Sequence, residues 1–335
     1  MKALVTGGGG FLGRRLVELL LQQGDEVTVV ARSSYPEVEA LGARCVQADL
    51  RDKGKLVGAV QGHDVVFHVA SRTGFWGKKG ANDYWAINVD GTNNLLEVIE
   101  TVGVSRLVYT STPSVVGYAQ DVANGGQDLP YADPHESIYP ESKAAAEAEV
   151  LRANGRTLAT VALRPHLIFG PGDNHLVPRL VDRAAAGKLP IIGDGSAKVD
   201  VTFIDNAAWA HIDAANVLIA HTVPCAGKPY FIGNEAPVLL YDWINEILEG
   251  LGYPPVTKRL SRDTARRLAS VVEWMWDTLP LKGEPRLTPF LVDGMARDHW
   301  YDPEPARRDL GYRPRVDMPT AMKATIAWLK QRDEG

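Results

Sequence analysis

The sequence predicts an α/β fold, a doubly wound parallel sheet accompanied by a smaller domain. Along the first two thirds of the chain, short apolar runs alternate with amphipathic segments of helical period. The first apolar run, residues 2–6, enters a glycine-rich turn at 7–13, which opens into a helical pattern at 11–23. Strands that alternate with helices form parallel sheets covered on both faces, which explains why the later runs are almost continuously apolar.

Composition narrows the class of protein. The 335 residues, 45% hydrophobic and 23% charged, are typical of a globular protein with a sizeable core. A net charge of −5 provides no basic surface for nucleic acid. Cys45 and Cys225 have no metal-ligand spacing and fit a reducing compartment. Residues 1–10 do not resemble a signal peptide, and no apolar run reaches the roughly 18 residues of a spanning helix. We therefore expect a soluble cytoplasmic protein without a metal site.

The glycine-rich turn carries the first functional signal. Gly7, Gly10 and Gly13 are spaced three apart between a strand and a helix, where the pyrophosphate of a dinucleotide would lie. Gly7 permits a tight turn, Gly10 removes a Cβ that would hold the backbone away from the phosphates, and Gly13 lets the helix pack closely on the strand. The flanking strand and helix favour this interpretation over a flexible glycine loop.

The second apolar run, residues 26–31, ends where such folds contact the adenosine ribose. A carboxylate there would bind a free 2′-hydroxyl group, but this chain has Ala31 followed by Arg32 and two serines. A guanidinium group can pair with a phosphate through two parallel hydrogen bonds. We therefore predict that the cofactor is NADP(H), with NAD(H) as the alternative. The other interpretation of Arg32 is an exposed, solvated side chain.

Three further strands are expected at residues 43–50, 64–70 and 106–110, with a helix at 87–101. We interpret His68, which lies inside a continuously apolar run, as a packed core residue rather than a catalyst. In the loop that follows, Phe75 and Trp76 are expected close to the nicotinamide.

A hydroxyl cluster and a Y-x-x-x-K pattern carry the predicted chemistry. Ser111 and Thr112 follow the strand at 106–110, and Tyr139 and Lys143 stand at the head of an alanine-rich helix. Side chains four apart share one helix face, so the ammonium can lie near the phenol. A nearby cation favours the phenolate and makes it usable as an acid or base nearer neutral pH. The alternative interpretation is a surface helix pair.

With these motifs the whole chain resembles an extended short-chain dehydrogenase/reductase of the 3β-hydroxysteroid dehydrogenase group, which has a Rossmann fold. The resemblance implies that Tyr139 is the general acid/base and that Lys143 lowers its pKa and binds the nicotinamide ribose. It implies that Thr112 holds the substrate carbonyl, with Ser111 as the alternative. The implied cofactor-binding residues are Gly7, Gly10, Phe11, Leu12, Gly13, Arg32, Asp49, Leu50, Val69, Ala70, Tyr139, Lys143 and Pro165.

The resemblance also divides the chain. Residues 1–172 and 200–234 would form the NADP-binding Rossmann domain, and residues 173–199 and 235–335 the smaller substrate-binding domain. It further implies a homodimer that binds a hydrophobic small molecule and no nucleic acid. Peripheral association with a membrane or with another enzyme of the pathway is left open.

Differences between this sequence and those of related enzymes narrow the class of substrate. Dehydratases of this superfamily carry an Asp-Glu pair where this chain has Pro113-Ser114. Sugar-nucleotide epimerases usually place an arginine at the position of Val199, and an asparagine at that of His166. The predicted pocket is therefore apolar rather than suited to a diphosphate.

Segments 6–13, 34–37, 109–115 and 299–301 resemble a bacterial branch of the family that reduces long-chain 2-alkyl β-keto acids in olefin biosynthesis. That resemblance implies reversible reduction of the ketone to the 3-hydroxy acid. The runner-up is a steroid or sterol dehydrogenase. A non-catalytic dinucleotide sensor is disfavoured, because a sensor has no need of Thr112, Tyr139 and Lys143 together. Candidates for binding the carboxylate are Arg72, Lys78, Lys79 and His166.

Residues 261–281 predict a helix, with Ser261 as N-cap and Asp263 in the first turn. An apolar row recurs at helical spacing, with Trp274 and Trp276 beside it: Leu268, Val271, Val272, Met275 and Leu279. Three interpretations are open. The row packs on the small domain, roofs the substrate cavity, or rests on a membrane.

Overall fold

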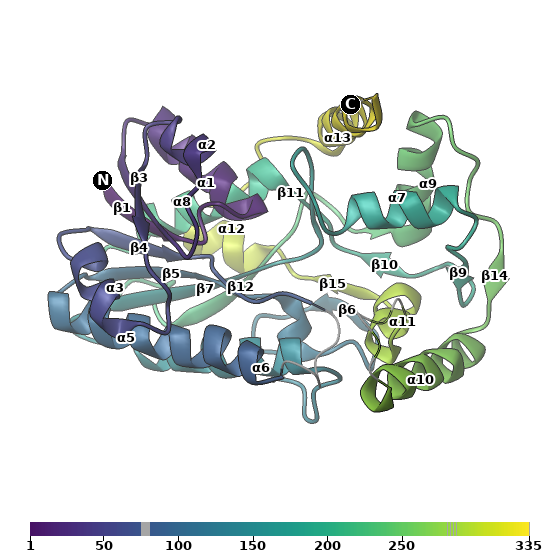
Figure 1. The fold of residues 1–335 in the computed structure, drawn as a ribbon, viewed down its shortest axis with the longest axis horizontal. Helices are drawn as coiled ribbons and strands as arrows, with labels where there is room; N and C mark the ends of the chain where they lie inside the picture. Colours follow the sequence, from purple (N-terminus) through teal and green to yellow (C-terminus); the bar gives the residue numbers. More distant parts are fainter. Residues whose placement is uncertain (75–80, 280, 282, 284, 286, 335) are drawn as a thin grey trace.

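The computed structural model describes residues 1–74, 81–279, 281, 283, 285 and 287–334. Its centre is a parallel sheet of seven strands in the order β12-β7-β5-β4-β1-β2-β3 (Figure 1). The strands are β1 (Lys2–Thr6), β2 (Glu26–Ala31), β3 (Arg44–Gln47), β4 (Val65–His68), β5 (Arg106–Thr110), β7 (Ala159–Pro165) and β12 (Lys228–Ile232). Chain order reverses beside β1, so the sheet is doubly wound and the predicted fold class is confirmed.

Helices cover both faces of this sheet (Figure 1). One face carries α1 (Phe11–Gln22), α8 (Ile204–Val217) and α12 (Glu304–Leu310), and the other carries α3 (Lys53–Val60), α5 (Gly91–Val102) and α6 (Ile138–Arg152). Alternate residues of a strand point to opposite faces. Accordingly, Val5 packs into the core beneath α1, whereas Leu4 packs into the core beneath α5.

The helix expected at 87–101 begins earlier than predicted. Among the described residues it starts with α4 (Ala81–Tyr84), passes through a π-helical turn at Trp85–Asp90 and continues as α5. A Cβ on Gly91 would lie 2.9 Å from the Cβ of Leu50, so this glycine lets α5 approach the segment that follows β3. The π-helical turn carries the buried Asn88, whose side chain donates to the Ser142 hydroxyl of α6 at 3.0 Å.

A smaller set of elements lies beyond the carboxyl ends of the central strands (Figure 1). Its four-stranded sheet has the order β13-β10-β15-β6, from Val238–Leu239, Lys198–Val199, His299–Tyr301 and Val122–Gly125. Two-stranded pairs are β11 (Thr202–Phe203) with β8 (Ile168–Phe169), and β14 (Arg259–Leu260) with β9 (Ile191–Ile192). The other α-helices of the described chain are α2 (Pro36–Glu39), which contacts β3, and five later ones: α7 (Val177–Ala185), α9 (Leu240–Gly250), α10 (Arg262–Thr278), α11 (Pro289–Ala296) and α13 (Met318–Glu334).

Within the described part of the chain, no helix is long and apolar enough to cross a bilayer.

The predicted N-cap of α10 is confirmed, because the Ser261 hydroxyl accepts the backbone N–H of Thr264 at 3.3 Å. α10 packs on α11 through the buried Ala265 and Ala269, whose small side chains allow close approach. Three residues of the predicted apolar row are exposed, Leu268 by 49%, Val271 by 56% and Leu279 by 44%, while Val272 and Met275 are half-buried. The exposed residues do not pack on the small domain as the first interpretation expected. A roof over the substrate cavity and contact with a membrane stay predictions.

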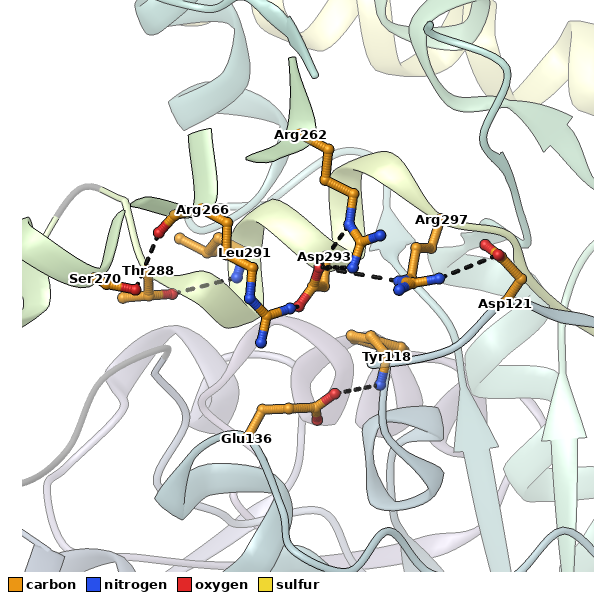
Figure 2. Close-up of polar contacts among 10 residues, drawn as sticks. All are labelled: Tyr118, Asp121, Glu136, Arg262, Arg266, Ser270, Thr288, Leu291, Asp293 and Arg297. Carbon is orange, nitrogen blue, oxygen red and sulfur yellow. Dashed lines mark hydrogen bonds and ion pairs between the residues drawn. The ribbon is translucent and has the colours of Figure 1, made fainter. Parts of the chain in front are cut away.

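The junction of α10 and α11 is built around one carboxylate (Figure 2). Asp293 of α11 is completely buried and faces three arginines. Arg262 Nε donates to its Oδ1 at 3.0 Å, Arg266 Nη1 pairs with Oδ2, and Arg297 Nε lies 3.9 Å away. Arg297 also donates to the exposed Asp121 at 3.1 Å. Since a buried carboxylate is tolerated only when it is paired, this cluster fixes how α10 lies on α11.

We expect Asp293→Asn to destabilise the protein. The cost should fall near the lower end of the roughly 3–5 kcal/mol for losing one partner of a buried pair, because the arginines are partly exposed. Urea unfolding would measure this cost. Asp121→Asn is the control, since its exposed pair with Arg297 should contribute less than about 1 kcal/mol. Equal stability of the two variants would contradict a structural role for the buried carboxylate.

Candidate active site

The turn between β1 and α1 contains Gly7, Gly10 and Gly13 and exposes backbone atoms without side chains; we call it the glycine cradle. Gly7 has a φ of +72°, and a Cβ on it would lie 2.8 Å from the backbone of Ala70. A Cβ on Gly13 would lie 2.2 Å from the carbonyl oxygen of Gly7, so α1 could not pack on the strand with any larger residue there. Gly10 donates its N–H to that same oxygen at 2.9 Å. Phe11 and Leu12 follow in the first turn of α1.

This geometry fits a dinucleotide pyrophosphate. The backbone N–H groups at the start of a helix attract anions, and glycines leave room for phosphate oxygens to approach them. The sequence prediction of this cradle thus agrees with the local structure. Among the described residues, no group of three or more His, Cys, Asp or Glu side chains is arranged to hold a metal ion.

A buried polar bridge joins the ends of β1 and β4. Thr6 Oγ1 lies 2.7 Å from His68 Nδ1, and His68 Nε2 lies 2.9 Å from Thr92 Oγ1. The backbone N–H of Ala70 donates to Thr6 Oγ1 at 3.2 Å, which places the half-buried Val69 and Ala70 beside the glycine turn. Burial lowers the pKa of His68 to about 3, so it stays neutral. The interpretation of His68 as a core residue is confirmed.

Arg32, Asp49 and Leu50, which were predicted to contact the adenosine part of the cofactor, follow β2 and β3. Arg32 is exposed just after β2, and its backbone oxygen accepts from Gln47 at 2.8 Å. Asp49 pairs with Arg51 at 2.7 Å, which lowers the pKa of Asp49 to about 2. Leu50 is buried. Arg32 adds to the lowering of this pKa through its charge, although the described residues place no carboxylate within ion-pair distance of its guanidinium.

Thr112 and Tyr139 meet although 27 positions separate them in the chain. Tyr139 lies in the first turn of α6, and the Thr112 hydroxyl lies close enough to its phenol to favour the phenolate. Thr112 itself caps the short 3₁₀ helix Pro113–Val116 and lies 3.1 Å from the Ser114 hydroxyl. Burial raises the pKa of Tyr139 to about 12, against the opposing effect of the Thr112 hydroxyl. The phenol is therefore protonated at neutral pH.

The expected effect of Lys143 on Tyr139 is wrong for this structure. Lys143 Nζ donates to the backbone oxygen of Thr110 at 2.6 Å and lies 4.1 Å from the ring centroid of Tyr109. Burial lowers the pKa of Lys143 to about 7. Since the amine is directed at the end of β5 and burial dominates at Tyr139, the pKa of Tyr139 is raised rather than lowered.

Residues outside the predicted set hold Tyr139 in place. Ser142 donates to the backbone oxygen of Tyr139 at 2.9 Å and accepts from Asn88 at 3.0 Å. Asn88 also exchanges two hydrogen bonds with the backbone of Arg72. Ser142 lies inside the Y-x-x-x-K segment and Asn88 inside the predicted helix, so their positions were visible in the sequence but their contacts were not.

The structure also tests the remaining candidates. The Ser111 hydroxyl is buried without a partner, so Thr112 is the hydroxyl beside Tyr139. Pro165 is the buried last residue of β7. The guanidinium of Arg72 lies over the ring of Tyr84 at 5.2 Å. The predictions for Phe75, Trp76, Lys78 and Lys79 fall outside the described residues.

His166 is a poor partner for a substrate carboxylate, contrary to the hypothesis from the sequence. It is buried, and its Nε2 lies 2.7 Å from Nδ1 of His299. Burial holds the pKa of His166 well below its ordinary value, so the ring is uncharged. The two rings stack with Tyr118, which in turn stacks on Phe290 of α11 at 5.2 Å. Tyr118 also donates its backbone N–H to Glu136 at 2.8 Å (Figure 2).

This fold, the glycine cradle and the Thr112–Tyr139 pair define an extended short-chain dehydrogenase/reductase. Residues 4–262 match the family model of the 3-beta hydroxysteroid dehydrogenase/isomerase family. A 2-alkyl-3-oxoalkanoate reductase of Stenotrophomonas maltophilia is 46% identical over 96% of this chain and 98% of its own. The mouse sterol-4-alpha-carboxylate 3-dehydrogenase, decarboxylating, is 35% identical over 97% and 90%. The solved structure of MoeE5 in complex with UDP-glucose and NAD, 26% identical, superposes with a TM-score of 0.76 over 99% of both chains. The chain therefore belongs to the 3-beta hydroxysteroid dehydrogenase/isomerase family.

Because His68 is neutral in the fold, we expect the stability to fall as the pH drops below about 6.5. Between this value and the folded pKa of about 3, the unfolded chain binds a proton that the folded protein excludes. One such histidine contributes at most about 1.4 kcal/mol per pH unit. His211 and His299, with pKa values of about 4, act in the same direction.

Urea unfolding at pH 7.5, 6.0 and 5.0 would measure this slope. In His68→Gln the free energy of unfolding should depend less on pH, because the unfolded variant has one fewer histidine to protonate. This holds whatever stability the variant loses at pH 7.5. An unchanged slope in the variant would show that His68 is not a source of the pH dependence.

Proposed function

We propose that this protein is an NADP(H)-dependent ketone reductase. Its substrate is a long-chain 2-alkyl-3-oxoalkanoate, which it converts reversibly to the 3-hydroxy acid. The observation that carries the proposal is the Thr112 hydroxyl beside the phenol of Tyr139, one helical turn before Lys143 on α6. The relative named 2-alkyl-3-oxoalkanoate reductase, which matches almost end to end, supports the substrate class.

The two hydroxyl groups act on the same substrate atom. Tyr139, protonated at neutral pH, delivers a proton to the ketone oxygen, and the Thr112 hydroxyl donates a hydrogen bond that polarises the carbonyl. When bound, the reduced nicotinamide supplies a hydride to the carbonyl carbon, so the product is a secondary alcohol. Lys143 lies on the same helix face as Tyr139, where it would contact the cofactor ribose.

The choice of NADP(H) rests on the end of β2. Ala31 has no carboxylate to bind a ribose 2′-hydroxyl group, and the Arg32 guanidinium is exposed, with only a longer-range interaction with Asp49. An exposed guanidinium at this position suits a 2′-phosphate. MoeE5 and several other solved neighbours carry NAD, which supports a nicotinamide dinucleotide in general and makes Arg32 the feature to test.

A second candidate function is oxidation of a sterol or 3β-hydroxysteroid. The similarity to sterol-4-alpha-carboxylate 3-dehydrogenases over nearly the whole chain favours it specifically. Both substrate classes place a carbonyl or alcohol next to an apolar body, so the same hydroxyl pair would serve either. We also propose that the family's homodimer is retained.

An NADPH-consumption screen tests the function directly. We expect turnover with 2-alkyl-3-oxoalkanoates and little with 3-ketosteroids or UDP-sugars. Tyr139→Phe should lower turnover by about two to four orders of magnitude while leaving NADPH binding nearly unchanged, because only the proton donor is lost. Tyr253→Phe, at an exposed position, is the matched control. Faster turnover of a 3-ketosteroid would favour the second function, and no turnover of any substrate would favour a sensor.

Arg32→Ala tests the cofactor. We expect it to weaken NADPH binding by about 1.5–3 kcal/mol, the usual contribution of a charge-assisted hydrogen bond, and to spare NADH. Isothermal titration with both cofactors would measure this difference, with the exposed Lys55→Ala as the control. Equal losses for NADPH and NADH, or a wild-type preference for NADH, would contradict the assignment.

A further inference from the structure

Gly9 is a glycine that the phosphate turn does not require. The pyrophosphate pattern uses Gly7, Gly10 and Gly13, and Gly9 lies outside the left-handed region that demands glycine. A Cβ on Gly9 would lie 2.3, 2.4 and 2.4 Å from three ring carbons of Tyr35. Side chains essentially never approach so closely, so the ring of Tyr35 occupies the space that any larger residue at position 9 would need.

Tyr35 is held in this place by the connection between β2 and α2. Its backbone oxygen accepts from the N–H groups of Val38 at 2.9 Å and Glu39 at 3.1 Å. Pro36 follows at the first position of α2, and the fully buried Val38 anchors that helix to the core. These backbone contacts hold the half-buried ring over the glycine turn, where the absence of a side chain on Gly9 leaves room for it.

The contact borders the part of the site that recognises the adenosine ribose. In dinucleotide-binding folds this ribose lies between the glycine turn and the end of the second strand. The N–H of Gly7 donates to the backbone oxygen of Val30 at 3.2 Å, which brings these two segments together here. Arg32 precedes Tyr35 by three residues. Within the described residues, the Arg32 guanidinium has no ion pair and the Tyr35 hydroxyl no hydrogen-bond partner.

We propose that Tyr35 is a second residue that determines cofactor choice, with its hydroxyl donating a hydrogen bond to the 2′-phosphate of NADP(H). This inference rests on the proposed preference for that cofactor. Arg32 supplies the positive charge, and Tyr35 supplies a neutral donor fixed against Gly9. A phosphate has several strong acceptor oxygens and can use both donors at once. A ribose with a free 2′-hydroxyl gains much less from the same pair.

Direct titration of the protein with NADPH and NADH tests the proposal without using activity. Tyr35→Phe keeps the ring on Gly9 and removes only the hydroxyl. We expect the Kd for NADPH to rise about tenfold, while the Kd for NADH changes less than about twofold. The fragments adenosine 2′,5′-bisphosphate and adenosine 5′-monophosphate should show the same contrast. Tyr253→Phe is the matched control and should leave all four Kd values unchanged.

Gly9→Ala provides a second variant, because a methyl group there must displace the ring. If it melts like the wild type, we expect it to lose NADPH affinity at least as strongly as Tyr35→Phe. Unchanged NADPH binding in Tyr35→Phe, or equal losses for NADPH and NADH, would overturn the role of Tyr35 while leaving that of Arg32 intact. A wild-type protein that binds NADH as tightly as NADPH would overturn both.

Discussion

The structure depends on how closely the turn after β1 approaches its neighbours. A Cβ on Gly7 would clash with the backbone of Ala70, and one on Gly13 with the oxygen of Gly7. These approaches let α1 pack on the sheet and align the ends of β1 and β4, which Thr6 and His68 then join through a buried hydrogen bond. The glycine turn follows the carboxyl end of β1 and Thr112 follows that of β5, so the sheet sets their relative positions. Tyr139 and Lys143 belong to α6, and Lys143 Nζ donates to the last residue of β5.

Burial then decides the protonation states in the site. It raises the pKa of Tyr139 to about 12 and lowers that of Lys143 to about 7, so both groups shift toward their neutral forms. A neutral phenol is the form that can deliver a proton to a ketone. Thr112 opposes the shift of Tyr139, so the hydroxyl and the phenol interact although burial dominates. In the proposed reaction the two groups would act through oriented hydrogen bonds on one substrate oxygen.

Much of this was predictable from the sequence, because local patterns dictate it. Five of the seven strands of the central sheet, the glycine cradle and the Ser261 N-cap follow from periodicity and spacing. Contacts between distant segments were not predictable. His166 and His299 are in contact although 133 positions separate them. In the sequence, Gly9 is indistinguishable from the glycines of the phosphate turn, and only the structure shows that the ring of Tyr35 lies against it. The contacts of α10 were not predictable either: two alanines, rather than large residues, are its buried contacts with α11, and Leu268, Val271 and Leu279 of its apolar row are exposed.

The α11 helix contacts both α10 and the segment around Tyr118. Asp293 ties it to α10 through arginines, and Phe290, one turn earlier, stacks on Tyr118. Tyr118 donates its backbone N–H to Glu136, three residues before Tyr139 (Figure 2). Ion pairs, a ring stack and a hydrogen bond therefore connect α10 to the residue three positions before Tyr139. If the proposed function holds, a substrate that displaces α10 would act on the position of Tyr139 through these contacts.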